Sequence, residues 1–484
     1  NIAPGQKVPL AKVGATLPGG FKLEKAKIRG VESFGMMCSL KELGLAEEAE
    51  GIYLLPDDAP VGMDLMEYLG LPETLFEVEI TPNRPDLLSH FGIARELAAN
   101  LKTEARFPNE PKLVESGADS SAKASVNVAD AGDCPLYSCR VLEGVKVGPS
   151  PRWLKERLER VGQRSINNVV DVTNYILMEL GQPLHAFDFA LLSGHRVEVR
   201  RAKDGEKLPL LDGTERTLTP DALVIADAEK AVALAGVMGG GNTMVTEGTT
   251  DILLEAAIFH SGLVRKTARR LGLSTDSSYR FERGVDPAMV RKALDRAAAL
   301  ILQVAGGEAR RGVIERSAKA HQPRVIDFRP ERSNKLLGLT LTADQQVDLL
   351  TRLGCRVVGT GGAVRLEAPS WRVDILQEID LIEEVARLNG YDRLPLAHPA
   401  IRISEVPMPE VQRASRDARR AFLRRGLCEA LNTSFLAPGF ADRLLLPPDH
   451  PFRGAPVLAN PIADDQTVLR PTLVPSLLAN VQLN

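Results

Sequence analysis

The sequence has few of the features that mark secreted, membrane-spanning or disulfide-stabilised proteins. Its 484 residues include only five cysteines, and their odd number and wide scatter argue against a disulfide framework and favour the cytoplasm as the expected location. No apolar run approaches the ~18 to 20 residues that a membrane span requires, so we expect no membrane association. Hydrophobic residues make up 44% and charged residues 25% of the chain, which is ordinary for a globular protein.

A zinc site built from cysteine is also disfavoured. Cys134 and Cys139 are the one closely spaced pair of cysteines in the sequence. The chain offers neither a second pair nor an adjacent histidine to complete a tetrahedral site. Zinc is therefore a minor alternative for this pair.

The formal net charge of −3 does not indicate a general nucleic-acid-binding protein, because affinity for phosphate usually comes from a basic surface. Two local stretches could still bind phosphate, residues 265–283 ("RKTARRLGLSTDSSYRFER") and residues 416–425 ("RDARRAFLRR"). Charge runs more often only keep a surface solvated, so a solvated face is the commoner role for either stretch.

The pattern of apolar and turn-forming residues predicts α+β structure. Short β-prone runs between Pro-Gly and Gly-Gly turns open the chain and predict a small β barrel, and a strand at 75–80 ("LFEVEI") leads into an amphipathic helix. Further on, strands mix with helices predicted at 151–161 and 286–304. A later helix should begin at the N-cap Thr342 and close at Gly354.

The length of the chain predicts three or four domains, since a single hydrophobic core stops growing at about 250 to 300 residues. A stretch rich in Pro, Ser, Gly and charge has the composition of a linker. The expected parts are the barrel at 1–73, a small α+β unit at 74–106, the linker at 107–125, an α+β domain at 126–317, a further unit at 324–395 and a last part at 401–484.

We expect the sequence to be an internal piece of a longer chain. It opens with "NIAPGQKVPL", without an initiator methionine or a targeting segment, and it ends in "LVPSLLANVQLN". The first strands of the barrel are accordingly expected to be missing.

Six carboxylates stand in residues 371–395 ("WRVDILQEIDLIEEVARLNGYDRLP"), a stretch that otherwise has the pattern of a buried helix. Projection at about 100° per residue puts three acids and one arginine on one stripe, namely Asp380, Glu383, Glu384 and Arg387. A solvated face explains them if Asp374 and Gln377 form a capping box and Glu383 pairs with Arg387. Alternatively, a divalent cation with oxygen ligands, or the cations of a partner, neutralise the repelling charges. The pattern leaves these alternatives open.

A second run, residues 163–188 ("QRSINNVVDVTNYILMELGQPLHAFD"), puts amides, hydroxyls, carboxylates and a histidine into apolar surroundings. Turn and cap roles explain most of these groups, which are Asn167, Asn168, Asp171, Thr173 and Asn174. His185 is either a satisfied core residue or a group for proton transfer near neutral pH. The loop "ALAGVMGGGNT" at 233–243 has four glycines that let backbone amides approach a ligand, but it lacks the spacing and the following helix of a dinucleotide site.

Five longer phrases are similar to one known family, in the same order along the chain. They are "IRGVESFGMMCS", "EVEITPNRPDLLSHFGIARELAA", "SINNVVDVTNYILMELGQPLHAFD", "STDSSYRFERGVDP" and "EIDLIEEVARLNGYDRLP". On these phrases the chain resembles the bacterial phenylalanyl-tRNA synthetase beta subunit over nearly its whole length. The resemblance implies a multidomain α+β fold: an OB-fold tRNA-binding barrel at 1–73, a B1-like unit at 74–106, a B3/B4 editing domain at 126–317, a B5 domain at 324–395 and the start of a class II synthetase-like, catalytic-like domain at 401–484.

The editing domain of this family is expected to hydrolyse tyrosine that has been wrongly attached to the phenylalanine tRNA. By match to the family motifs, the catalytic groups are Arg164, His185 and Glu255, with Glu255 accepting the tyrosine hydroxyl. The resemblance also implies a pocket wall formed by Thr173, Asn174, Gly239, Gly240, Thr275 and Ser277. From the residues alone, Glu255 is equally a strand-end carboxylate tied to an arginine. No Ser-His-Asp arrangement stands in these motifs, so we expect hydrolysis by a positioned water.

The resemblance further implies a Mg²⁺ site in the B5 domain, close to a catalytic alpha subunit, with the ligands Asp374, Asp380, Glu383 and Glu384. The whole enzyme is expected to contain two alpha and two beta chains and to join phenylalanine to tRNA(Phe) using ATP and Mg²⁺, with the synthetic site on the alpha chain. The alternative function is a noncatalytic tRNA-binding or scaffold protein. A free-standing hydrolase of a small substrate is a third possibility.

Overall fold

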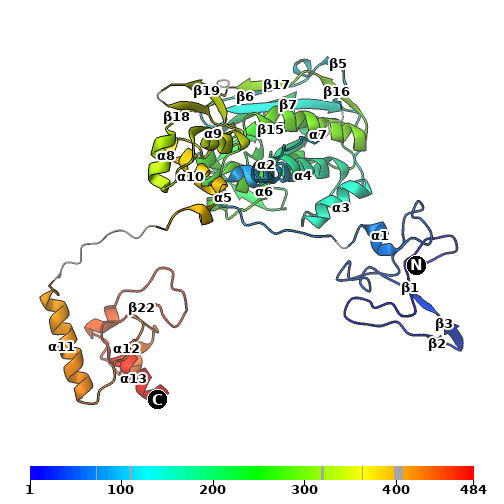
Figure 1. Cartoon of the computed structure of the whole chain (residues 1–484). Coiled ribbons are helices and arrows are strands. Elements are labelled where there is room, and N and C mark those ends of the chain that lie inside the picture. The colour runs from blue at the N-terminus through cyan, green and yellow to red at the C-terminus, as the bar shows by residue number, and fades with distance from the viewer. Residues whose placement is uncertain (72, 109–111, 318–320, 362, 397–406) are drawn as a thin grey trace. The chain divides into compact units, whose positions relative to one another are not determined.

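The computed structural model describes the chain except for residues 72, 109–111, 318–320, 362 and 397–406 (Figure 1). Its contacts divide it into two units, Asn1–Pro395 and Leu396–Asn484. The start of the last predicted part, at residue 401, lies outside the described residues. Within the described part, no helix is both long enough and apolar enough to cross a membrane.

A six-stranded sheet forms the centre of the first unit (Figure 1). Five strands follow the order β5-β16-β7-β15-β8, and β17 also pairs with β7. All neighbours are antiparallel except β5 and β16. The strands are β5 (Glu115–Asp119), β7 (Leu136–Glu143), β8 (Leu184–Asp188), β15 (Ile252–Ile258), β16 (Glu308–Arg311) and β17 (Ile314–Ser317).

A five-stranded sheet packs against one face of the six-stranded sheet. Its order is β14-β13-β12-β9-β6, and its apolar side chains share one core with those of the first sheet. The strands are β6 (Ser125–Val128), β9 (Arg196–Arg201), β12 (Leu223–Ala226), β13 (Ala231–Leu234) and β14 (Met238–Gly239). A hairpin of β10 (Lys207–Pro209) and β11 (Glu215–Thr217) contacts β13.

Helices cover the other face of the six-stranded sheet (Figure 1). They are α3 (Arg152–Arg160), α4 (Asn168–Leu180) and α7 (Met289–Ala305), which confirms the helices predicted at 151–161 and 286–304. The alternation of side chains along β15 separates the two cores: Leu253 and Ala257 join the core between the sheets, whereas Leu254 and Ala256 join the core beneath the helices. Glu255 stands between Leu254 and Ala256, so it faces the core between the sheets.

Two further helices contact each other, and the first of them also contacts β12 of the second sheet. They are α5 (Ser261–Leu271) and α6 (Asp276–Phe281). Thr275 is the N-cap of α6, and it forms a capping box with Ser278. The cap fixes where the helix begins, and so fixes the position of Ser277 on its first turn.

The N-terminal stretch, predicted to be a small β barrel without its first strands, contains short ladders. Among the described residues of 1–73, β1 (Leu10–Lys12) pairs with β4 (Gly35–Met37) and β2 (Ala26–Ile28) pairs with β3 (Val31–Ser33). Helix α1 (Leu65–Leu69) follows. The strand predicted at 75–80 is not formed, because this segment has no ladder partner in the described structure. The amphipathic helix predicted after it is α2 (His90–Leu101), which begins at the N-cap Ser89.

The predicted linker, 107–125, is only partly irregular. Residues 109–111 of it lie outside the described structure, but Glu115–Asp119 form β5 and Ser125 begins β6. Pairing with β16, which lies far along the chain, makes a strand of a segment whose composition is that of a linker. Tertiary pairing here overrides local propensity.

The unit that follows has a three-stranded sheet of order β18-β20-β19 with three helices. Its elements are β18 (Val325–Phe328), α8 (Pro330–Leu337), α9 (Ala343–Arg352), β19 (Arg356–Thr360), β20 (Val364–Glu367) and α10 (Glu378–Asn389). The predicted N-cap Thr342 is confirmed and forms a capping box with Gln345. The box predicted for Asp374 and Gln377 is wrong, because Gln377 is itself the N-cap of α10 and its reciprocal partner is Asp380.

The second unit, Leu396–Asn484, has a small core of its own. It contains α11 (Glu410–Arg424), β21 (Phe435–Leu436), α12 (Phe440–Arg443), β22 (Val468–Leu469) and α13 (Val474–Leu483). β21 and β22 form an antiparallel pair, and the core is built from Leu436, Phe440, Ala441 and Val468.

Candidate functional site

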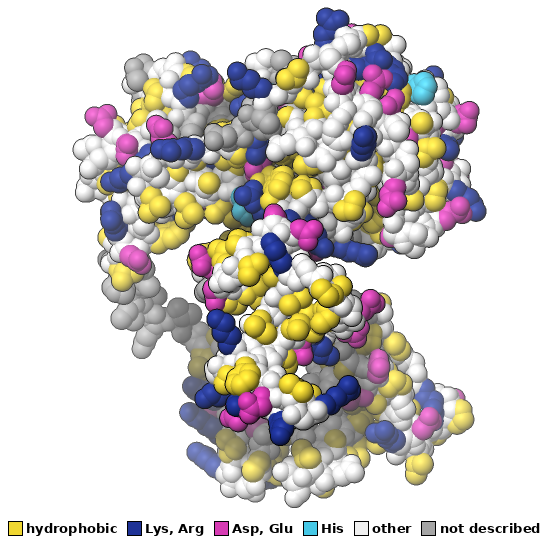
Figure 2. All heavy atoms as spheres, turned by 90° about the vertical axis from the view of Figure 1, so that its right-hand side faces the viewer, with side chains coloured by type: hydrophobic (Ala, Val, Ile, Leu, Met, Phe, Trp, Pro, Cys, Tyr) yellow, Lys and Arg dark blue, Asp and Glu magenta, His cyan; other side chains and the backbone are white. Residues whose placement is uncertain are grey.

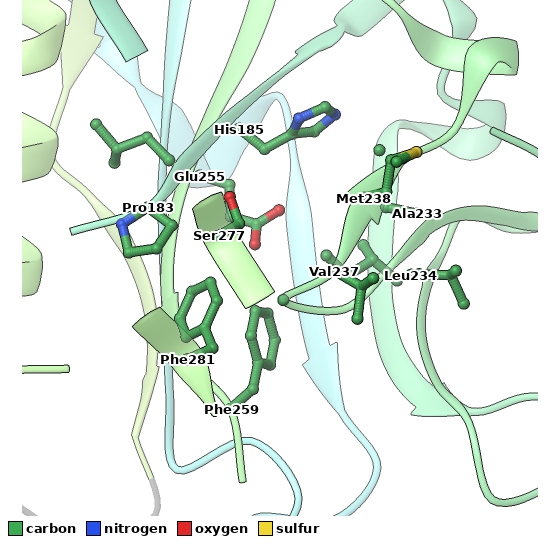
Figure 3. A pocket seen from close by; sticks show the side chains of 14 residues that line it. Pro183, His185, Ala233, Leu234, Val237, Met238, Glu255, Phe259, Ser277 and Phe281 are labelled. Carbon is green, nitrogen blue, oxygen red and sulfur yellow. The ribbon is translucent and has the colours of Figure 1, made fainter. Parts of the chain in front are cut away.

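A pocket with a volume of about 50 Å³ lies between the two sheets and α6 (Figure 3). Side chains from β8, β12, β13, β14, β15 and α6 form its walls, and most of the residues that line it are apolar. The lining residues are Pro183, Leu184, His185, Ile225, Ala233, Leu234, Gly236, Val237, Met238, Gly239, Glu255, Phe259, Ser277 and Phe281. An apolar concavity with a few converging polar groups has the character of a ligand site.

Three polar side chains enter the pocket, each from a different element. His185 on β8 and Glu255 on β15 are directly paired across neighbouring strands, so both point to the same face of the sheet. Ser277 comes from the first turn of α6. In Figure 3, the Glu255 carboxyl and the Ser277 hydroxyl lie between the ring of His185 and the rings of Phe259 and Phe281.

The carboxyl of Glu255 is 5% exposed and is held by a tyrosine rather than by an arginine. Tyr137 donates a hydrogen bond from its hydroxyl to Glu255 Oε2 at 3.2 Å. Burial raises the pKa of Glu255 to about 8, and the hydrogen bond from Tyr137 opposes the rise without cancelling it. At pH 7 the carboxyl is therefore mostly neutral, and it can donate as well as accept a hydrogen bond.

His185 is neutral near pH 7 as well. Its ring meets Phe187 edge-on, with centroids 4.5 Å apart, and its Nε2 is buried without a hydrogen-bond partner in the described structure. Burial lowers the pKa of His185 to about 4. An imidazole nitrogen that is buried and unpartnered is ready to bind a group that enters the pocket, such as a water molecule.

The glycine-rich loop gives the histidine its room. A Cβ atom on Gly239 would lie 2.3 Å from His185 Cε1 and 2.8 Å from its Nε2. At Gly236, φ is +70°, a conformation that other residues seldom adopt. The loop therefore serves both the turn into β14 and the close packing of the imidazole.

The pocket brings together four of the residues predicted from the sequence: His185, Gly239, Glu255 and Ser277. The others, Arg164, Thr173, Asn174, Gly240 and Thr275, do not line it. Local hydrogen bonds account for three of them. The Thr173 hydroxyl donates to Val170 O within α4 at 2.7 Å, the Thr275 hydroxyl donates to Val237 O at 2.7 Å, and the Gly240 amide donates to Val232 O at 2.8 Å. Thr275 and Gly240 thus support the pocket wall from behind.

Arg164 is exposed, on a segment that the structure ties to α6. Its neighbour Gln163 donates from its side chain to Asp276 Oδ2 at 2.9 Å, next to Ser277. The buried carboxylate of Asp171 holds the far side of the segment by accepting from Ser165 Oγ at 2.5 Å and from the Ile166 amide at 2.8 Å. Asn174 is half-buried on α4 and takes part in neither the Gln163 nor the Asp171 hydrogen bonds of the described structure.

The aromatic walls of the pocket were not predicted from the sequence. Phe259 follows β15 and Phe281 ends α6, and their ring centroids are 5.1 Å apart. Met238 and Val237 form the opposite wall (Figure 3). Each of these residues has the pattern of an ordinary core residue, so only the packing of α6 against the sheets identifies them. Tyr137, which holds Glu255, was missed for the same reason.

The acidic residues around α10 are neutralised by arginines of the same chain. Arg372 donates to Asp374 at 2.8 Å through Nε and to Glu384 at 2.9 Å through Nη2. Glu384 also accepts from Arg387, so the ion pair predicted between Glu383 and Arg387 is replaced by one between neighbours on the helix. Burial on its own would raise the pKa of Glu384, but the hydrogen bonds and charges of the two arginines outweigh it and hold the pKa at about 2.

The remaining acids also have local roles. Asp380 accepts from the amides of Leu376 at 2.8 Å and Gln377 at 2.9 Å, as an acid in the first turn of a helix does. Glu383 is exposed. Glu378 forms ion pairs with Arg329 and Arg332 from the start of α8.

A metal ion therefore does not fit the four predicted ligands in this arrangement. Within the described residues, no group of three or more His, Cys, Asp or Glu side chains is placed to hold one. Asp374 and Glu384 are occupied by arginine, Asp380 by backbone amides, and Glu383 points to solvent. The Mg²⁺ site predicted at these residues stays a prediction that this arrangement does not support. Cys134 and Cys139, the cysteine pair that was considered for zinc, are buried and have free thiols.

Charges of both signs are interspersed on the surface. Figure 2 shows Lys and Arg side chains next to Asp and Glu side chains over the face in view, with hydrophobic side chains between them. Such a surface creates no field of a single sign on that face, in keeping with the net charge of −3.

Three domain families match the chain in consecutive stretches. The B3/4 domain matches residues 133–306, the tRNA synthetase B5 domain matches residues 326–391, and the phenylalanyl tRNA synthetase beta chain CLM domain matches residues 394–484. The whole pocket lies within the first stretch and α10 lies within the second.

Relatives match along the whole chain. The phenylalanine--tRNA ligase beta subunit of Geobacter metallireducens is 49% identical over 479 residues, which are 99% of this chain and 60% of the relative. The beta subunits of Moorella thermoacetica and Geobacillus kaustophilus are 46% and 44% identical, over 99% and 100% of this chain and 60% of each relative. The chain belongs to the phenylalanine--tRNA ligase beta subunit family.

Within the beta subunit family, the chain spans about 60% of the length of the curated relatives it matches. A crystal structure of an N-terminal fragment of the phenylalanyl-tRNA synthetase beta subunit from Pyrococcus horikoshii matches 64% of this chain and 85% of the fragment, at 19% identity and a TM-score of 0.33. That likeness is too low to support a comparison of the folds.

Proposed function

We propose that this chain is part of a phenylalanine--tRNA ligase, which attaches phenylalanine to its tRNA at the expense of ATP, and that its 126–317 domain hydrolyses tyrosine misattached to that tRNA. The observation that carries the proposal is the apolar pocket with a buried, unionised carboxyl, Glu255, beside an unpartnered histidine nitrogen, His185. The match of residues 133–306 to the B3/4 domain and the family of the chain support it.

Tyrosine differs from phenylalanine by one hydroxyl, and this difference decides what an editing pocket must do. A synthetic pocket that is apolar cannot strongly reject an analogue that only adds a hydroxyl. A second site that hydrogen-bonds the hydroxyl can discriminate strongly, because phenylalanine would leave its buried polar group unpaired. Glu255 is such a group, surrounded by the apolar walls of Phe259 and Phe281.

In this mechanism, Glu255 binds the phenol oxygen of the tyrosyl group. A neutral carboxyl offers an oxygen that accepts the phenolic hydrogen and a hydroxyl that donates. It also avoids placing a full charge in the pocket, which would be costly in apolar surroundings. The ring of the tyrosyl group would extend along the aromatic wall, and the unbranched Met238 opposite is the side chain best able to adapt to it.

Hydrolysis of the ester would use water that is positioned and deprotonated by His185. The Nε2 of His185 is buried and has no hydrogen-bond partner in the described structure, and a neutral imidazole accepts a proton. Ser277 is the one hydroxyl side chain among the lining residues, and the unpartnered His185 nitrogen does not activate it as a nucleophile. Arg164, exposed beside this end of α6, would stabilise negative charge on the incoming tRNA.

The finer assignments that go with this function are proposals as well. We propose an OB-fold origin for residues 1–73, a B1-like unit at 74–106, a B5 domain at 324–395 and a class II synthetase-like start at 401–484. The partners would be tRNA(Phe) and a catalytic alpha subunit, in an assembly of two alpha and two beta chains in the cytoplasm. ATP and Mg²⁺ are proposed for the reaction of the whole enzyme, and no residue of this chain is proposed as a Mg²⁺ ligand.

The experiment is deacylation of tyrosyl-tRNA(Phe) by the complete enzyme, with Glu255→Ala and His185→Ala compared with the parent and with aminoacylation measured in parallel. The proposal predicts loss of deacylation with charging intact in both variants. Deacylation that survives both changes would overturn the proposal and favour the noncatalytic scaffold as the role of the domain.

A further inference from the structure

Tyr137 does not line the pocket, but it contacts a residue that does, because its hydroxyl bonds to the Glu255 carboxyl. The tyrosine is not among the lining residues, and its side chain is 0% exposed. A buried tyrosine hydroxyl requires a hydrogen-bond partner. Its partner here is Glu255 Oε2, at 3.2 Å, which belongs to the one carboxyl among the lining residues.

We propose that Tyr137 is a positioning residue for substrate selection, whose hydroxyl fixes the Glu255 carboxyl in the orientation that recognises a phenolic hydroxyl. The inference rests on the proposed editing function and deepens it, because it names the group that aims the selecting carboxyl. Tyr137 does not face the pocket, so any effect it has on a substrate passes through Glu255.

The register of the strands creates this contact. Glu255 is paired with Cys139 on β7 and with His185 on β8, and Tyr137 is paired with Ala257, two residues further along β15. Tyr137 is thus the diagonal neighbour of Glu255 on the same face of the sheet. Diagonal neighbours lie within reach of an aromatic side chain, and here the hydroxyl closes the remaining distance.

The chemistry of the two groups explains why one bond can orient the carboxyl. A phenol has a single hydrogen to donate, and Tyr137 uses it on Oε2. This leaves Oε1 of Glu255 for a ligand and opposes rotation of the carboxyl group. A polar group held in its working orientation before the substrate arrives binds that substrate without the cost of reorganisation.

Other titratable groups around Glu255 give it little electrostatic guidance. Those that face it are Cys134 ahead of β7, Tyr137 and Cys139 on β7, and His185 on β8. Burial raises the pKa of both thiols and of the Tyr137 phenol, and lowers the pKa of His185, so all four are neutral near pH 7. A charged residue, Arg316 on β17, is paired with Tyr137, but its guanidinium donates to Val126 O at 3.0 Å, so the hydrogen bond from Tyr137 is the directional contact that sets the carboxyl.

The test uses the complete enzyme, with alpha subunits, carrying Tyr137→Phe. The initial deacylation rate is measured on tyrosyl-tRNA(Phe) and on phenylalanyl-tRNA(Phe). We expect the preference for the tyrosyl substrate to fall by about tenfold or more, the effect of one well-placed buried hydrogen bond. The slow hydrolysis of the phenylalanyl substrate should be unchanged. Because the bond from Tyr137 lowers the pKa of Glu255, the pH at which the tyrosyl rate changes should also move upward in the variant.

Cys139→Ala is the matched control, since Cys139 is buried on the same strand and lies directly opposite Glu255. It should keep the parental preference and the parental pH profile. If Tyr137→Phe also keeps both, the tyrosine only fills the core and the inference is overturned. If the parent enzyme itself fails to hydrolyse tyrosyl-tRNA(Phe), the proposed function has failed first, and the inference falls with it.

A double-mutant cycle keeps the test decisive if Tyr137→Phe lowers stability. Glu255→Ala, which removes the acceptor of the Tyr137 hydrogen bond, is combined with Tyr137→Phe, and charging activity is measured to confirm that each preparation is folded. A residue that acts through Glu255 adds nothing once that acceptor is gone, so the double variant should deacylate tyrosyl-tRNA(Phe) at the residual rate of Glu255→Ala alone. A further loss of the same size as in the parent background would show that Tyr137 acts by packing and would contradict the proposal.

Discussion

Arg372 and Glu384 form a buried ion pair: Nη2 of the arginine lies 2.9 Å from Oε1 of the glutamate, and the two side chains are 2% and 5% exposed. Arg372 precedes α10 and Glu384 lies in its middle, so the pair ties the approach of the chain to the helix. Each charge has been removed from water, and the pair is compensated further by Asp374 beside Arg372 and by Arg387 beside Glu384. The acidic pattern of this stretch thus helps to hold the fold of the unit.

Replacing Glu384 should strongly destabilise this unit. Glu384→Gln leaves the buried Arg372 with Asp374 as its remaining carboxylate partner, and losing one buried hydrogen-bonded contact to a charged group costs about 1 to 3 kcal/mol of unfolding free energy. Glu383→Gln is the control, because Glu383 is the exposed neighbour and should change stability by about 0.5 kcal/mol or less. Denaturant unfolding followed by the fluorescence of Trp371, in a Trp153→Phe background that removes the second tryptophan, reports on the unit. Equal effects of the two changes would contradict the pairing.

The stabilisation by Glu384 should vanish in acid. Its pKa is about 2 in the folded chain and 4.5 ordinarily, so the unfolded chain takes up this proton first as the pH falls. The contribution is complete above the ordinary pKa and is lost as the pH falls toward 2. The stability difference between the parent and Glu384→Gln should therefore be constant above about pH 5.5 and shrink below it.

Magnesium should have no effect on the stability of this chain by itself. Asp374, Asp380 and Glu384 are engaged by arginines and backbone amides, which leaves Glu383 alone exposed among the four predicted ligands, and no group of three or more such side chains within the described residues is placed to hold the ion. A ligand at about 100 times its Kd would stabilise the fold by about 2.7 kcal/mol. Thermal unfolding in excess Mg²⁺ and in excess chelator should give the same midpoint. A higher midpoint in Mg²⁺ that disappears in Asp380→Asn would refute this expectation.

The contribution of Glu255 to the free energy of unfolding should fall as the pH rises. Its pKa is about 8 in the folded chain and 4.5 ordinarily, so the folded chain retains a proton that the unfolded chain releases. The stability that this proton gives is full below the ordinary pKa and is lost as the pH rises through 8. Glu255→Gln cannot ionise at this position. The difference between its unfolding midpoint and that of the parent should therefore rise between about pH 5 and pH 8.5.

The control for that series is the exposed Glu229, changed to Gln, which should show no such climb. His185 works in the opposite direction, because its neutral form is favoured by folding and stability is lost as the pH falls from 6.5 toward 4. It is present in all three proteins, so its effect cancels in the comparison. A midpoint difference for Glu255→Gln that stays flat with pH would show that Glu255 is charged in the fold.

Gly239→Ala should impair the pocket with little harm to the fold. The added methyl would lie 2.3 Å from His185 Cε1, so the imidazole must move, and a displacement of about 1 Å in a catalytic group can cost about a hundredfold in rate. Gly241→Ala is the control, because its nearest atom would be the Leu210 carbonyl oxygen at 3.3 Å. Deacylation of tyrosyl-tRNA(Phe) should fall in the first variant and persist in the second, with charging retained in both. Parental deacylation by Gly239→Ala would mean that His185 need not keep its place.

Structural features that depend on a few neighbouring residues could be predicted from the sequence. Thr342 directly follows a β-prone run and precedes a helical pattern, so its role as an N-cap could be predicted before the fold was known. The helices α3 and α7 followed from apolar periodicity in the same way. His185, Glu255, Gly239 and Ser277 were expected in one pocket from the resemblance rather than from spacing, and the structure brings these four together.

Contacts between distant segments of the chain could not be predicted from the sequence. Helical projection placed Glu383 and Glu384 on one stripe, but it could not show that Glu384 faces Arg372 from outside the helix. Nor could it show that Arg387 also pairs with Glu96, 291 residues away. Tyr137 and Glu255 are 118 residues apart, and their contact depends on the register of two strands. Such pairs are set by the fold, so the local pattern carries no sign of them.

The most direct test of the central claim is the selectivity of deacylation in Glu255→Ala. The ratio of kcat/KM for tyrosyl-tRNA(Phe) to that for phenylalanyl-tRNA(Phe) is measured with the complete enzyme for the parent and the variant. If Glu255 recognises the phenolic hydroxyl, the ratio should be large in the parent and should approach one in the variant. A variant that keeps the parental ratio would contradict the claim that this pocket reads the hydroxyl through Glu255.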